Sequence, residues 1–122
     1  MKRVKGQIFN SDGKYIFGEL EIEKDKIISV NELDKEDLSD EEKSRKVIPG
    51  LIDIHMHGAA GKDICRCSMD ELETVVEYEK RHGITSICPA TMTLEENDLL
   101  GICKKVAECA KRRAEIKGIY LE

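Results

Sequence analysis

The fold is decided by the stretch VIPGLIDIHMHG, which occupies residues 47–58. It is a β-prone run with a proline near its start, and a glycine-containing loop at residues 58–63 follows it. Side chains alternate between the two faces of a strand, so Asp53, His55 and His57 share one face. The stretch therefore predicts a strand with a polar face and an apolar face that packs against helices; the apolar face comprises Ile48, Ile52, Ile54 and Met56.

Beyond this stretch, strand and helix patterns alternate. Short apolar runs at residues 84–89 and 119–121 predict two further strands, and helical patterns fill the intervals. Helices of this kind often begin with a capping box, in which a serine or threonine precedes a glutamate by three residues. Three such pairs are predicted to begin helices: Ser39 with Glu42, Ser68 with Glu71, and Thr93 with Glu96. From residue 47 the order is β-α-β-α-β, which is typical of parallel strands joined by helical crossovers.

The first 46 residues follow a different pattern. β-prone runs at residues 4–9, 15–22 and 27–30 are separated by turns, which predicts an antiparallel meander. The apolar alternation of the second run is interrupted at Gly18 and Glu19, which predicts a bulge there. A charged connector follows at residues 31–46. We therefore expect an α/β chain with two parts, residues 1–46 and residues 47–122.

Composition and charge exclude several classes of protein. The 122 residues carry 20 basic and 25 acidic side chains, a net charge of -5, and only five aromatic residues. No basic stripe indicates nucleic-acid binding, and no apolar run indicates a membrane segment or a secretory signal. Five cysteines, an odd number, favour reduced and inert thiols. We expect a cytoplasmic protein that binds neither nucleic acid nor membrane.

His55 and His57 are the candidate chemical centre. Two imidazoles on one strand face can bind one divalent cation, and Asp53 on the same face is expected to hold one of them in place. The alternative is that both are core histidines bonded to backbone groups. We favour the metal, because the pair is followed by a glycine-containing loop at the carboxyl end of the strand. Without further information, Glu122 is expected to be a solvated chain end.

Residues 49–58, PGLIDIHMHG, resemble the first barrel strand of the metal-dependent amidohydrolase superfamily. Three further stretches look like the N-acetylglucosamine-6-phosphate deacetylase family within it: HGAAGKD at 57–63, GITSICPAT at 83–91 and GIYLE at 118–122. Residues 1–46 are also similar to the strands that precede the barrel in that family. Tyr120 stands where the family usually has a histidine, and Ala59 and Ala60 depart from its glycine-rich loop.

The resemblance implies the first three strands and two helices of a (β/α)8 barrel, preceded by strands of a small β-sandwich. It implies one or two divalent metal ions, zinc or iron, with His55, His57 and Glu122 as ligands. Gly58, Gly61 and Asp63 would border the active site, with Asp53 as a supporting group. These assignments form the set of site residues that we expect: His55, His57 and Glu122 for metal, and Asp53, Gly58, Gly61 and Asp63 as supporting or loop residues.

The implied activity is hydrolysis of N-acetylglucosamine 6-phosphate, an amino-sugar phosphate, to glucosamine 6-phosphate and acetate. The family's catalytic aspartate and later metal ligands would match positions beyond residue 122, so we expect an N-terminal portion that is inactive alone. Two alternatives are a dihydroorotase-like cyclic-amide hydrolase, which shares only the first motif, and a non-catalytic module that associates with itself. Because an open sheet exposes an edge and apolar surface, we expect a homo-oligomer or a swapped assembly.

Overall fold

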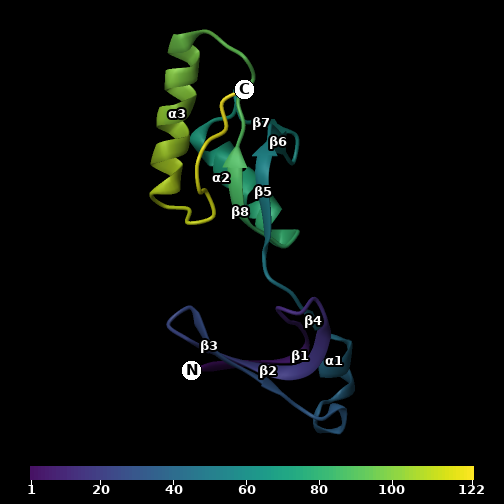
Figure 1. Cartoon of the computed structure of the whole chain (residues 1–122). Helices are drawn as coiled ribbons and strands as arrows, with labels where there is room; N and C mark the ends of the chain where they lie inside the picture. Colours follow the sequence, from purple (N-terminus) through teal and green to yellow (C-terminus); the bar gives the residue numbers. More distant parts are fainter. The chain divides into compact units, whose positions relative to one another are not determined.

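The computed structural model describes residues 1–122, and the chain divides into two compact units, Met1–Pro49 and Gly50–Glu122 (Figure 1). The chain combines α and β structure, and its N-terminal unit is rich in β-strands. Neither unit contains a helix that is both long enough and apolar enough to cross a membrane.

The first unit is built around a four-stranded sheet with the order β3-β2-β1-β4. The predicted meander is confirmed, since β1, β2 and β3 pair antiparallel in sequence order. The fourth strand, β4, pairs parallel with β1. The strands span Lys2–Phe9 (β1), Tyr15–Glu23 (β2), Lys26–Glu32 (β3) and Lys46–Val47 (β4).

The bulge predicted at Gly18 and Glu19 is wrong. The register between β1 and β2 runs unbroken through this point, where Gly18 lies opposite Gly6. The irregularity lies between Glu21 and Ile22, in the pairing of β2 with β3. Gly18 leaves one position of the apolar face without a side chain, which interrupts the sequence pattern without shifting the strand.

The charged connector contains the short helix that its capping box predicts. A 3-10 turn, η1 (Lys35–Asp37), precedes α1 (Asp40–Ser44). The Ser39 hydroxyl accepts a hydrogen bond from the Glu42 amide at 3.3 Å, and the Glu42 carboxylate accepts one from the Ser39 amide at 2.8 Å. The predicted strand run that begins at residue 47 is divided, because Val47 lies in β4 and a new strand begins at Leu51.

The second unit combines two helices with two parallel strands and a small hairpin. β5 and β8 pair parallel, and β6 and β7 form an antiparallel hairpin between β5 and α2. The bounds are Leu51–Met56 (β5), Gly58–Ala59 (β6), Lys62–Asp63 (β7), Met69–Arg81 (α2), Ile84–Pro89 (β8) and Glu96–Ala110 (α3). The predicted third strand at residues 119–121 is not a regular strand. Residues 116–120 instead follow β8 through two isolated parallel bridges, at Ile87–Ile116 and Ala90–Tyr120.

The two helices of this unit begin differently. At α2, Ser68 and Glu71 form the predicted capping box. At α3 the predicted box of Thr93 and Glu96 is absent, because the helix begins one residue after Glu95, which makes no side-chain cap. The Thr93 hydroxyl is used elsewhere and donates to the Glu122 carbonyl at 3.4 Å.

The core of the second unit lies between the two helices, β8 and the hairpin. Helix α2 packs on β8, on α3 and on the β6–β7 hairpin. Met56 is the one β5 residue in the core. Ile52 and Ile54 are each 69% exposed, so the expectation that helices cover their face is wrong. The reason is that α2 packs on β8 and the hairpin, whereas β5, an edge strand of the sheet, makes no comparable contact with either helix.

Charged pairs hold the segment after α3 against α2. Arg113 lies 3.2 Å from Glu77 and 3.4 Å from Glu115, and Lys80 lies 3.2 Å from Glu115. A hydrogen bond from its own backbone amide, aided by Lys80 and Arg113, lowers the pKa of the Glu115 carboxyl. These pairs fix the start of the segment that leads along β8 to Glu122.

All five cysteines are free thiols. Burial raises the pKa of the Cys67 and Cys109 thiols, which keeps them protonated.

Candidate metal centre

Three side chains from two distant parts of the second unit meet at the carboxyl end of β5. His55 lies near the end of β5, His57 follows that strand directly, and Glu122 lies beyond the segment that runs along β8. The Nε2 atoms of the two imidazoles are 3.0 Å apart. Oε2 of Glu122 lies 2.9 Å from Nε2 of His57 and 3.4 Å from Nε2 of His55. Three potential ligand atoms therefore form a compact triangle.

The triangle has dimensions that suit a divalent ion. A tetrahedral ion with ligands at about 2.0–2.1 Å places those ligands roughly 3.3 Å from one another. The observed separations of 2.9, 3.0 and 3.4 Å are close to that value. Two imidazoles with one carboxylate are a donor set that zinc and iron accept. The three side chains are 39–45% exposed, so the triangle is open on one side to water or a further ligand.

Backbone hydrogen bonds to β8 bring Glu122 to this place. The Tyr120 amide donates to the Pro89 carbonyl, and the Thr91 amide donates to the Tyr120 carbonyl, each at 2.9 Å. Thr91 is fully buried, and its hydroxyl accepts a hydrogen bond from the Glu122 amide at 3.4 Å. Thr91 and Thr93 were missed as supporting residues; their position just after a predicted strand was the available signal.

Asp53 has a different role from the one expected. Its Oδ1 accepts a hydrogen bond from the backbone amide of His55 at 3.0 Å. The carboxylate therefore turns along its own strand and shapes the backbone of β5. It contacts neither imidazole through a hydrogen bond.

The loop after His57 is a tight hairpin. Gly58 has φ +150°, and a Cβ at this residue would lie 1.9 Å from the Lys62 carbonyl oxygen. Oδ1 of Asp63 accepts the Cys65 amide at 2.7 Å, which turns the chain toward α2. Gly58, Gly61 and Asp63 line an open hollow together with His57, and none of the three contributes an atom to the triangle.

From the sequence alone, Tyr120 was notable only because it departs from the family pattern. Its ring packs against the His55 imidazole, with the ring centroids 4.4 Å apart and the planes tilted by 30°. The same residue is fixed through its backbone to β8. Tyr120 is therefore a direct neighbour of a candidate ligand.

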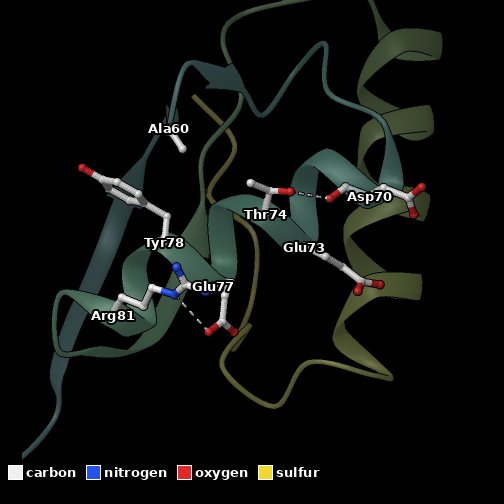
Figure 2. Close-up of a pocket in the computed structure, with 7 residues that line it drawn as sticks. All are labelled: Ala60, Asp70, Glu73, Thr74, Glu77, Tyr78 and Arg81. Carbon is white, nitrogen blue, oxygen red and sulfur yellow. Dashed lines mark hydrogen bonds and ion pairs between the residues drawn. The ribbon is translucent and has the colours of Figure 1, made fainter.

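The larger hollow on this unit lies elsewhere. Figure 2 shows it along the exposed side of α2, where Arg81 pairs with Glu77 at 3.5 Å and the Thr74 hydroxyl donates to the Asp70 carbonyl at 3.0 Å. Glu73, which also lines it, lies 3.1 Å from Arg112. It contains none of the three potential ligands.

Comparison with curated proteins relates the chain to sugar-phosphate deacetylases. It is 32% identical over 77 residues to the N-acetylgalactosamine-6-phosphate deacetylase of Escherichia coli O157:H7 and 35% identical over 82 residues to the N-acetylglucosamine-6-phosphate deacetylase of Vibrio furnissii. These matches cover 61% and 62% of the chain. The chain spans about a fifth of the length of these relatives. No family model matches it.

Solved structures show the same fold. N-acetylglucosamine-6-phosphate deacetylase from Thermotoga maritima aligns with 98% of this chain and 31% of its own, at a TM-score of 0.83 and 21% identity. The enzyme from Mycobacterium smegmatis aligns with 100% of this chain and 35% of its own, at a TM-score of 0.80 and 24% identity. The predicted resemblance to a portion of this family is thereby confirmed.

Proposed function

We propose that this chain provides the first metal ligands of an N-acetylglucosamine-6-phosphate deacetylase, which hydrolyses its substrate to glucosamine 6-phosphate and acetate. The observation that carries the proposal is the triangle of His55, His57 and Glu122. Both parts of it lie in stretches that resemble the deacetylase family. The Vibrio furnissii relative bears the name of such an enzyme, and the Escherichia coli relative that of an N-acetylgalactosamine-6-phosphate deacetylase.

The proposed architecture follows from the same likeness. Residues 47–122 would supply the first three strands and two helices of a (β/α)8 barrel. Residues 1–46 would supply strands of a small β-sandwich. In a barrel of this kind the carboxyl ends of the strands carry the active site, which is where His55, His57 and Glu122 lie in the second unit.

The residues of this chain have distinct parts in the proposed reaction. A divalent ion, zinc or iron, supplies the Lewis acidity that activates water and polarises the acetyl carbonyl. His55, His57 and Glu122 would hold it. Gly58, Gly61 and Asp63 border the substrate beside His57. Asp53 keeps the backbone at His55 in place, and the buried Thr91 holds the Glu122 backbone.

A dihydroorotase-like hydrolase is the less supported alternative. It rests on residues 49–58 alone, a motif that many amidohydrolases share. The stretches at residues 83–91 and 118–122 favour the deacetylase, because they resemble that family and supply Glu122 together with Thr91, which bonds the Glu122 amide.

A chimeric enzyme tests this function. We expect the Vibrio furnissii enzyme, with its matching segment replaced by this chain, to release acetate from N-acetylglucosamine 6-phosphate. We expect the same chimera with His57→Ala to lose at least about 100-fold in kcat/KM, since a metal ligand is removed. The isolated chain is expected to release no acetate, because it supplies three ligands and no group placed for proton transfer. A metal-loaded chimera that hydrolyses dihydroorotate and leaves the amino sugar intact would favour the alternative.

We also propose that this cytoplasmic chain associates with a second copy when isolated. Strand β5 has an unpaired edge, and its exposed face carries Ile52 and Ile54. An apolar edge strand with free backbone groups pairs readily with another strand.

Ile54→Lys is expected to reduce this association, because a charge on an exposed edge strand opposes strand pairing. Sedimentation velocity measures the result as a shift from dimer or larger species toward monomer. Leu100→Lys, on the exposed side of α3, is the control and should leave the distribution unchanged. A wild-type chain that sediments only as a monomer at the same concentrations would contradict the proposal.

A further inference from the structure

We infer that Tyr120 is the residue that orients His55 for metal binding, by stacking on its imidazole. The inference rests on the metal-binding role proposed above and names a positioning residue for that site. It concerns a position at which this chain departs from the family pattern.

His55 lacks the support that a metal-binding histidine usually has. A histidine that binds metal normally donates its second ring N–H to a carboxylate, a carbonyl or water, which fixes the orientation of the ring. Here the His55 side chain is bonded only through Nε2, toward His57 and Glu122. Asp53, the nearest carboxylate in sequence, bonds the His55 backbone amide. No protein hydrogen bond at Nδ1 fixes the imidazole.

An aromatic ring lies beside the His55 imidazole. The centroid of the Tyr120 ring lies 4.4 Å from that of His55, at an angle of 30°. Contacts at about this distance between tilted or offset rings are favourable and restrict rotation of both side chains. Stacking therefore limits the rotation of His55 that would move its Nε2 away from Glu122.

Backbone hydrogen bonds hold Tyr120 itself in place. Its amide donates to the carbonyl of Pro89 in β8, and its carbonyl accepts from the amide of Thr91, two residues beyond that strand. Glu122 follows two residues later on the same segment. One short segment thus delivers both a ligand carboxylate and the ring that orients a ligand imidazole.

Cobalt binding by the 122-residue chain tests the inference, with affinity measured by isothermal titration calorimetry. We expect Tyr120→Leu to weaken Co²⁺ binding about tenfold, as loss of a group that orients a ligand does. We expect Tyr120→Phe, which keeps the ring, to bind Co²⁺ as the wild type does. Tyr78→Leu is the matched control. The Tyr78 ring stacks on His82, away from the triangle, with the ring centroids 4.3 Å apart and the planes at 37°. This substitution should leave the Co²⁺ affinity unchanged.

A second measurement reports on Tyr120 in well-folded protein. The chain has three tyrosines and no tryptophan, so its emission comes from tyrosine. Co²⁺ at the triangle should quench part of this emission in the wild type, and Tyr120→Phe should remove that quenching. Wild-type protein that binds no Co²⁺ would overturn the metal site itself. Wild-type binding with equal affinity in Tyr120→Leu, or equal quenching in Tyr120→Phe, would overturn the role of Tyr120 alone.

Discussion

Replacing His57 with alanine is expected to abolish stoichiometric metal binding by this chain. The Nε2 atom of His57 lies within 3.0 Å of both other potential ligand atoms, so its loss removes the central member of the triangle. Loss of supporting groups around a metal typically weakens binding about 10–100-fold, and loss of a ligand is expected to exceed that range. Zinc content after dialysis, measured by mass spectrometry, checks the result.

The remaining histidines provide the comparison. His55→Ala should lose metal as His57→Ala does. His82→Ala should retain it, because the His82 ring bonds the Tyr78 carbonyl at the end of α2 and lies outside the triangle. Equal zinc content in the wild type, His55→Ala and His57→Ala would remove the ligand assignment.

Gly58→Ala is expected to destabilise the second unit by about 2–4 kcal/mol, through backbone strain and a steric clash. The added Cβ would lie 1.9 Å from the Lys62 carbonyl oxygen, and φ is +150°, where residues with side chains rarely lie. Relief requires the β6–β7 hairpin to open. Because Gly58 follows His57 directly, we expect metal affinity to fall as well. Urea unfolding followed by circular dichroism measures the loss.

Gly61→Ala separates the effect of backbone strain from that of the steric clash at Gly58. Gly61 has φ +72°, and nothing lies within 4 Å of the position of its Cβ. Its substitution should cost about 1 kcal/mol, the usual penalty for a left-handed residue. A Gly58→Ala protein no less stable than Gly61→Ala would show that the hairpin tolerates the clash.

The sequence predicted the face shared by Asp53, His55 and His57, because strand alternation is a local property of the backbone. Its prediction that helices would cover the opposite face was wrong. Ile52 and Ile54 have the pattern of buried residues and are exposed, since the path of α2 is set by its packing on β8 and the hairpin. Periodicity identifies which residues share a face, and tertiary packing decides what covers it.

The hydrogen bonds that Asp53 and Thr93 make near the triangle could not be predicted from the sequence either. Thr93 has the spacing of a cap, but its hydroxyl donates to the Glu122 carbonyl because the segment after α3 returns to β8. Asp53 has the spacing of a group that holds an imidazole, but a short side chain reaches its own backbone first. A short polar side chain has several partners within reach, and only the folded chain selects one.

The position of Glu122 beside His57 has a further consequence for stability. About 65 residues separate these two ligands along the chain, so an ion held by both would close a long loop, as a disulfide does. Such a cross-link would tie residues 118–122 to the end of β5. Removing the ion should therefore loosen this segment first and lower the unfolding temperature of the second unit, even though the helices and their core contain no ligand.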